Sequence, residues 1–170
     1  ATPKRKGVLH SGAGRIGKLR MRPMSLYESR DSSGSVRLSD ICHGKMTPAM
    51  TGAVSLHALA RLIVRGGWPG NLAVEQDAIG LLPASYLDAV IDDDIQRMDG
   101  VKRDAHKLRL LLRSLARNES TTATNKTLKN DIKEIDDEDI DVETVAVYLD
   151  IFERLFLIDN QTFLIDILRY

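Results

Sequence analysis

This sequence of 170 residues has a single cysteine, Cys42, and few aromatic residues. A lone cysteine excludes a disulfide framework and a zinc site built from several cysteines, and it indicates a reducing, cytoplasmic setting. Aromatic residues make up 5% of the chain, too few for the platforms that stack single-stranded nucleic acid. No apolar run approaches the roughly 18 residues of a membrane span, and the first residues lack the apolar core of a signal peptide. We therefore expect a cytoplasmic protein without a membrane partner.

Net charge is also missing, because 24 basic residues balance 24 acidic ones. A neutral chain is not expected to coat nucleic acid or a membrane through bulk electrostatics. The charges are nevertheless segregated into blocks of +6 over residues 1–40, −3 over 41–100, +5 over 101–131 and −8 over 132–170. Such blocks either meet within the molecule or engage separate partners, unless they are simply solvated faces of different helices. A further hypothesis is that they hold two copies together as a homo-oligomer.

A glycine-rich stretch near the start satisfies two nucleotide-binding patterns at once. Residues 12–17 read G-A-G-R-I-G, and with Lys18 they also fit G-x-x-x-x-G-K. Both patterns need a strand before the loop and a helix after it. Pro23 follows too soon for a useful helix, and Leu19 stands where a phosphate loop needs a hydroxyl. The sequence therefore predicts a basic turn that leads into a short strand over residues 18–22.

No residue set has the spacing of a catalytic or metal site. The adjacent side chains of Cys42 and His43 diverge, which argues against a nucleophile pair. Residues 92–94 are all aspartate, but neighbours on a helix point about 100° apart, so we interpret them as a solvated helix end. The acidic run 134–141 lacks the apolar strand of a Walker B motif. The histidines show no zinc-ligand spacing; they are His10, His43, His57 and His106.

Apolar periodicity predicts a mainly helical fold. Ser55 caps an expected helix through Arg65, which ends at the G-G-W-P-G run 66–70. Its apolar residues share one face: Leu56, Leu59, Ala60, Ile63 and Val64. A second helical region is expected from about Leu72 to Ile95, adjusted near Pro83.

Three more helices are expected in the second half of the chain. They span about residues 102–117, 126–135 and 142–155, with apolar stripes facing inward. The inward positions are Leu108, Leu111, Leu112 and Leu115 in the first, and Val145, Tyr148, Leu149, Phe152 and Leu155 in the last. Residues 156–158 and 162–167 are β-prone. The expected fold is thus a helical bundle followed by a winged-helix-like module, with short β segments at both ends.

The winged-helix order raises DNA binding as an alternative function. Readout of DNA needs basic or amide side chains on the exposed face of the third helix, whereas this helix carries Asp141, Glu143 and Asp150. The basic side chains lie instead on the two helices before it. A free-standing winged-helix DNA-binding regulator would therefore contact DNA through Arg109, Arg113, Arg117, Lys126 and Lys129.

Four segments together resemble prokaryotic AAA+-superfamily ATP-binding proteins. Residues 11–29 look like the segment after the sensor-1 strand of that family, in which a Gly-Arg pair precedes a strand and a Pro-x-Ser-aromatic-Glu-like motif. The matching positions are Arg15, Pro23, Ser25 and Glu28. Residues 65–70 are similar to the family's Gly-Gly-aromatic-Pro signature. Residues 85–95 resemble a helix that leads to an Asp-Ile/Val pair, and residues 142–160 look like the winged-helix segment.

The resemblance implies a division into three parts. Residues 1–53 would be left from an AAA+ core, residues 54–100 would form a helical lid-like region, and residues 101–170 would form the winged-helix-like module. The family's P-loop and Walker B motif precede the matched stretch, and a nuclease-like domain follows it. The resemblance therefore implies a fragment whose partners are the missing AAA+ core and C-terminal domain.

The same resemblance sets the expected function. The fragment alone would be non-catalytic, and it would couple nucleotide state to a protein partner in the full-length protein. ATP and magnesium are expected only for that full-length protein, an ATPase by its family. For this chain, the resemblance assigns only Arg15 a nucleotide-proximal role, where its guanidinium would approach a γ-phosphate.

Overall fold

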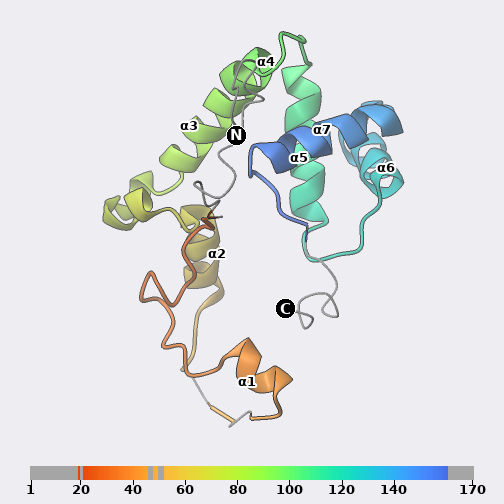
Figure 1. Ribbon diagram of the computed structural model, residues 1–170. Helices are drawn as coiled ribbons and strands as arrows, with labels where there is room; N and C mark the ends of the chain where they lie inside the picture. Colours follow the sequence, from red (N-terminus) through yellow and green to blue (C-terminus); the bar gives the residue numbers. More distant parts are fainter. Residues whose placement is uncertain (1–18, 20, 46–47, 50–51, 161–170) are drawn as a thin grey trace, which may run out of the picture. The chain divides into compact units, whose positions relative to one another are not determined.

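The computed structural model describes residues 19, 21–45, 48–49 and 52–160, and this part of the chain is mainly helical (Figure 1). Its contacts group the chain into two compact units. We call the described residues up to Asp88 the N-terminal unit and the described residues from Ala89 to Asn160 the C-terminal unit. None of the described helices is long and apolar enough to cross a membrane. The predicted three-part division rests on the family resemblance and stays a prediction.

The N-terminal unit is built from short helices. These are α1 (Leu38–Cys42), α2 (Leu56–Arg65), the 3₁₀ turns η1 (Pro69–Ala73) and η2 (Gln76–Ala78), and α3 (Leu81–Ala89). The prediction for α2 is confirmed, because the Ser55 hydroxyl accepts a hydrogen bond from the Ala58 amide at 3.1 Å. A serine cap of this kind contributes about 1 kcal/mol. Gly66 ends the helix with φ of 66°, a left-handed value that glycine adopts without strain.

The region predicted to be helical from about Leu72 to Ile95 consists of several helical elements. Two 3₁₀ turns precede α3, and α3 is followed by a π-helical stretch, η3 (Val90–Asp94), and by α4 (Ile95–Arg97). Pro83 lies in the first turn of α3, where its missing amide hydrogen costs no helical hydrogen bond. Pro83 therefore lies at the start of a helix, whereas the sequence predicted a change within a continuing helical region.

The C-terminal unit contains the three longest helices of the described chain: α5 (Ala105–Arg117), α6 (Asn125–Asp136) and α7 (Val142–Arg154). Each begins and ends close to its predicted bounds. Asp104 caps α5 by accepting from the amides of His106 and Lys107 at 2.9 and 3.2 Å. Thr124 and Thr127 form a reciprocal capping box at the start of α6, so local side chains specify where both helices start.

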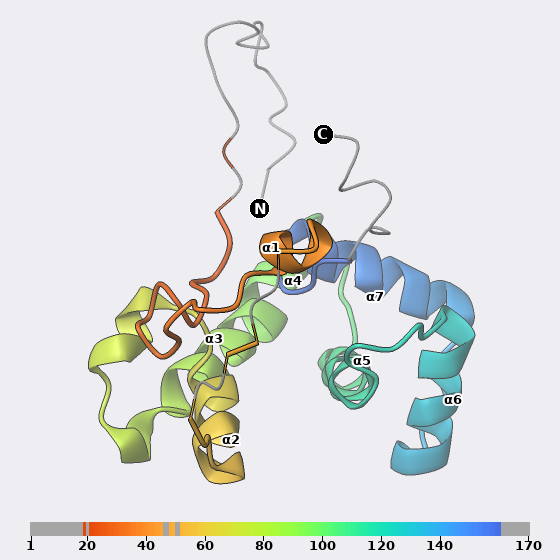
Figure 2. The ribbon, with the colours of Figure 1, turned by 90° about the horizontal axis from the view of Figure 1, so that it is seen from below.

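These helices enclose a hydrophobic core. α5 contacts η3, α6 and α7, and Figure 2 views α5 along its axis with α6 and α7 around it. The predicted inward residues Leu112, Leu115, Leu149 and Leu155 lie partly buried at the core's edge. The buried apolar residues are Val90, Ile91, Ile95, Leu108, Leu110, Leu111, Leu128, Ile132, Ile140, Val145, Tyr148, Ile151 and Phe152.

The predicted terminal strands are not observed in the described residues. Leu19, Met21 and Arg22 have no regular structure, and the other residues of the expected strand over 18–22 lie outside the described part. Phe156 and Leu157 lie in a turn after α7, in which the Leu157 amide donates to the Phe152 carbonyl at 2.9 Å, and Ile158 has no regular structure. The strand prediction is wrong there because the helix end satisfies that backbone group locally. The β-prone stretch 162–167 lies outside the described residues.

Candidate functional site

Two segments that carry the family resemblance lie in contact within the N-terminal unit. The Met24 amide donates to the Gly67 carbonyl at 2.7 Å. A Cβ atom on Gly67 would lie 2.5 Å from the Met24 carbonyl oxygen and 2.8 Å from Pro23 Cβ, closer than van der Waals contact allows. Only glycine therefore fits at position 67. We call residues 23–31 and 65–71 together the motif junction.

Ion pairing reinforces the motif junction. Arg65 Nη2 lies 2.5 Å from Asp31 Oδ2, and Nη1 lies 3.2 Å from Asp31 Oδ1. This two-pronged pair is largely covered, with side-chain exposures of 13% for Arg65 and 25% for Asp31. Hydrogen bonds from Arg65 lower the pKa of Asp31. Arg65 Nη2 also donates to the Ser29 hydroxyl at 3.3 Å, so one guanidinium ties the segment 29–31 to the end of α2.

Other residues of the motif junction make hydrogen bonds and packing contacts that hold its two segments in place. Glu28 Oε2 accepts from the Ser25 amide and hydroxyl at 2.8 and 2.9 Å, and the backbone hydrogen bond is the main reason that the pKa of Glu28 is lowered. The Asn71 side chain is buried and donates to the Arg65 carbonyl at 2.7 Å. The Trp68 ring packs edge-on against Tyr86, with 4.4 Å between centroids. The motif junction thus holds a loop in one conformation.

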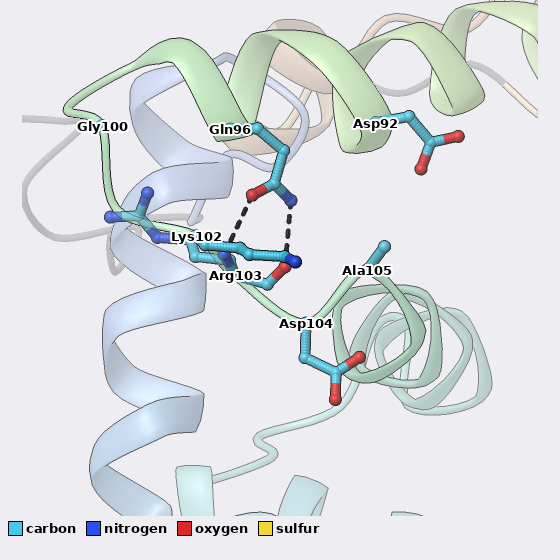
Figure 3. Close-up of a pocket in the computed structure, with 7 residues that line it drawn as sticks. All are labelled: Asp92, Gln96, Gly100, Lys102, Arg103, Asp104 and Ala105. Carbon is cyan, nitrogen blue, oxygen red and sulfur yellow. Dashed lines mark hydrogen bonds between the residues drawn. The ribbon is translucent and has the colours of Figure 1, made fainter.

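A pocket of about 820 Å³ lies in the C-terminal unit, beside the loop that joins α4 to α5. Figure 3 shows Gln96 extending from its helix to the backbone of Arg103. Gln96 Nε2 donates to the Arg103 carbonyl at 3.1 Å, and Oε1 accepts from the Arg103 amide at 2.9 Å. The pocket is lined by Asp92, Gln96, Gly100, Lys102, Arg103, Asp104 and Ala105.

The side chain of Arg103 makes a second set of contacts in the same loop. Its guanidinium donates to both carboxylate oxygens of Asp99, at 2.8 and 2.6 Å, and to the Ile95 carbonyl at 3.3 Å. The Arg103 side chain is 9% exposed. Its hydrogen bonds lower the pKa of Asp99 to about 2. Gln96, Asp99 and Arg103, which we call the loop clamp, therefore fix the connection between α4 and α5.

Most charged side chains that line the pocket form ion pairs or hydrogen bonds within the chain. Asp92 pairs with Arg109 at 3.0 Å, Asp104 caps α5, and Arg103 pairs with Asp99. Within the described chain, Lys102 has no hydrogen bond or ion pair. The lining residues do not form a nucleophile–base pair. No three metal-ligating side chains gather among the described residues.

The residues predicted to contact nucleic acid fall into two groups. Arg117 pairs with Asp131 at 2.6 Å and with Asp136 at 2.8 Å, and its hydrogen bonds lower the pKa of Asp131. Lys129 lies 3.6 Å from Asp139, and Arg109 pairs with Asp92. Arg113 and Lys126 are exposed and make no ion pair within the described residues. Three of the five cations are thus neutralised within the chain, so the basic and acidic blocks meet in the molecule.

The other candidate residues that the structure describes do not gather at one site. Arg15 and the glycine-rich stretch 12–17 lie outside the described residues, as does His10. Cys42 is exposed, and the adjacent His43 is bonded through Nδ1 to the Ser39 carbonyl at 2.6 Å. His57 is exposed, and His106 Nε2 lies 3.9 Å from Glu138. Asp92, Asp93 and Asp94 are exposed as predicted.

Sequence reasoning missed the loop clamp. The available signal was the arginine four residues after Asp99, a spacing typical of charge pairs on helices, with Gly100 between them to permit a turn. The contribution of Gln96 had no sequence signal, because its partners are backbone atoms seven residues away.

Comparison with known proteins gives a match to a family model. Residues 56–162 match the model of a family described as a domain of unknown function (DUF8612). No curated protein and no solved structure matches the chain. The matched region begins at α2 and includes the loop 66–71, the loop clamp and the hydrophobic core.

Proposed function

The chain belongs to the DUF8612 family, and we propose that it is the non-catalytic helical part of a cytoplasmic AAA+-type ATP-binding protein. Its role is to couple the nucleotide state of an ATP-binding core to a protein partner. The observation that supports this most is the motif junction, because two segments that resemble AAA+ proteins, 23–28 and 65–70, are far apart in sequence and in contact in space.

The internal organisation of the chain agrees with a coupling role. The two compact units divide at the end of α3, directly before the π-helical stretch η3. π-Helical turns within helices are frequent at functional sites. The loop clamp holds the next connection rigid. We propose that α5, α6 and α7 are the helical part of a winged-helix-like module, and that Arg15 approaches the nucleotide when the ATP-binding core is present.

DNA binding remains the second candidate function, supported by the exposed and unpaired side chains of Arg113 and Lys126. It is the weaker candidate because affinity for duplex DNA depends on how many phosphates are neutralised. Three of the five predicted cations already neutralise carboxylates of this chain. Electrophoresis of a labelled duplex at low salt should show no retardation. Retardation that disappears as salt is raised would support the DNA-binding alternative.

Two measurements test the AAA+ proposal. Calorimetric titration of this chain with Mg-ATP should give no binding heat, because ATP and magnesium are bound by the core of the full-length protein. Micromolar affinity would overturn that expectation. In addition, the gene should encode G-x-x-x-x-G-K-[ST] in frame before this segment, and a reading frame without that motif would contradict an AAA+ origin.

Coupling itself is tested by hydrogen exchange in the full-length protein. A non-hydrolysable ATP analogue with magnesium should change the exchange of amides in the motif junction and in η3. The buried amides of α5 and α7 serve as an internal control and should not change. Equal exchange with and without nucleotide in the motif junction and η3 would contradict a coupling role.

A further inference from the structure

The π-helical turn η3 contains one residue more than an α-helix would place there. The Ile95 amide donates to the Val90 carbonyl, five residues back, whereas an α-helical amide donates to the carbonyl four residues back. Helical structure continues on both sides of the turn, through α3 before it and α4 after it. The segment from Leu81 to Arg97 is therefore a helix with a one-residue insertion at residues 90–94.

The burial of the side chains follows this π-helical spacing. Val90, Ile91 and Ile95 are at most 2% exposed and belong to the hydrophobic core, while the three aspartates between Ile91 and Ile95 are exposed. In an α-helix, residues four apart share a face, so Asp94 would follow Val90 into the core. The insertion is thus the feature that places Ile95 in the core and leaves Asp94 in solvent.

An α-helical turn at this place would bury a carboxylate. With Val90 and Ile91 held in the core, closing the turn to α-helical spacing would move Asp94 into the position of Ile95 and pass one residue into the loop after α4. Burial of an unpaired carboxylate is unfavourable, and so is the loss of a buried isoleucine from the core. The order of apolar and acidic residues therefore selects the π-helical register.

The loop clamp contacts the helix in the same register. Gln96 Nε2 donates to the Ile91 carbonyl at 3.4 Å, and Arg103 Nη1 donates to the Ile95 carbonyl at 3.3 Å. Gln96 also bonds the backbone amide and carbonyl of Arg103 (Figure 3). A shift of one residue along the helix would turn the Gln96 side chain by about 100°, away from Arg103. The loop clamp therefore forms only with the π-helical register.

We propose that η3 and Gln96 form a register lock, in which the one-residue insertion in the helix sets the conformation of the loop before α5. The inference goes beyond the proposed function and does not depend on it. Packing of Ile95 in the core places Gln96, and Gln96 then fixes the backbone of Arg103, one residue before the cap of α5. The aspartates of η3 exclude the α-helical register, because that register would bury one of them.

Two substitutions at neighbouring aspartates test the register lock. In Asp94→Leu, the new leucine can replace Ile95 in the core, so the α-helical register becomes accessible and the loop clamp opens in part of the molecules. The Arg103 amide, which donates to Gln96 Oε1, should then exchange its hydrogen at least about tenfold faster. Nuclear magnetic resonance of the labelled chain in deuterated water measures this rate.

Asp93→Leu is the matched control. Asp93 is also exposed, but it does not enter the core in either register. Its ion pair with Arg97 is exposed and contributes little. Exchange of the Arg103 amide should therefore stay as slow as in the unaltered chain. Equal exchange rates in Asp93→Leu and Asp94→Leu would overturn the proposal.

Deletion of Asp93 tests whether η3 contains a surplus residue. Without Asp93, the spacing between Val90 and the isoleucine is four residues, so the turn can become α-helical with the same side chains buried and Gln96 still beside Arg103. The chain should keep both its urea midpoint and the slow exchange of the Arg103 amide.

Deletion of Val147 is the control for this experiment. Val147 is an exposed residue of α7 that lies between the buried residues Val145 and Tyr148. Its removal should lower the urea midpoint strongly, because the core residues that follow it turn by about 100°. If deletion of Asp93 lowers the midpoint as much as deletion of Val147, η3 has no surplus residue and the register lock is contradicted.

Discussion

The two units of this chain are stabilised in different ways. Every buried apolar residue of the described chain lies at or after Val90, in the C-terminal unit. Among the described residues of the N-terminal unit, Asn71 alone is buried. That unit is held together by ion pairs, helix caps, the close fit at Gly67 and the packing of Trp68 against Tyr86. Because apolar burial is the main favourable term in folding, the C-terminal unit should supply most of the stability of the chain.

The difference arises from where the apolar stripes point. The stripes of α5, α6 and α7 face one another and enclose a core, whereas the stripe of α2 faces solvent. Amphipathic periodicity is equally clear in α2 and α5. A helix can therefore be strongly amphipathic without belonging to a core.

The largest expected effect comes from the core of the C-terminal unit. Phe152 is fully buried, and Phe152→Ala should lower the free energy of unfolding by about 3–5 kcal/mol. Urea unfolding, followed by far-ultraviolet circular dichroism, measures this free energy of unfolding. Val147→Ala, at an exposed position of the same helix, should change it by less than about 0.5 kcal/mol. Equal effects of the two substitutions would contradict the conclusion that apolar burial stabilises the C-terminal unit.

A smaller, local effect is expected at the motif junction. Gly67→Ala places a methyl group against the Met24 carbonyl and Pro23, which should cost about 1–3 kcal/mol. Trp68 is the single tryptophan of the chain, so its fluorescence reports unfolding of the N-terminal unit. Gly70→Ala is the control, because a Cβ there has no neighbour within 4 Å. A shift in the circular-dichroism transition of the C-terminal unit would show that the units are not independent.

The loop clamp predicts a pH dependence of the C-terminal unit. Hydrogen bonds from Arg103 lower the pKa of Asp99 to about 2, below the roughly 3.9 of an unfolded aspartate. The stabilisation is therefore complete above about pH 4 and is lost as the pH falls toward 2. Unfolding by urea between pH 2 and pH 6 should show this loss, and Asp99→Asn should lack it. Asp77→Asn, which alters an exposed aspartate of the other unit, should keep it. An identical pH profile for Asp99→Asn would contradict the assignment.

The smallest effect is expected on the exposed face of α2. Leu56→Ala should change the free energy of unfolding by less than about 0.5 kcal/mol, because Leu56 is 82% exposed. Leu108→Ala removes the same atoms from a fully buried position and should cost about 2–5 kcal/mol. A large cost for Leu56→Ala would mean that the face of α2 is already covered within the chain.

Much of the helical structure could be predicted from sequence because its signals are local. Ser55 caps α2 and Asp104 caps α5, within three residues of the amides that they bind. The strand over 156–158 was predicted wrongly because β propensity acts only where a neighbouring strand is available. In the loop clamp, the spacing of Asp99 and Arg103 is a recognisable signal. Gln96 is bonded to backbone atoms, and the motif junction joins residues that are distant in sequence, so no spacing rule identifies those contacts.

Composition, capping residues and apolar periodicity were sufficient to establish a mainly helical chain and the positions of α2, α5, α6 and α7. These properties depend on interactions within a few residues. Tertiary structure decided which apolar stripes enclose a core and which stripe stays exposed. It also decided that Arg109, Arg117 and Lys129 pair with carboxylates of their own chain. Both outcomes depend on how separate helices are arranged in space, which the order of residues along one helix does not specify.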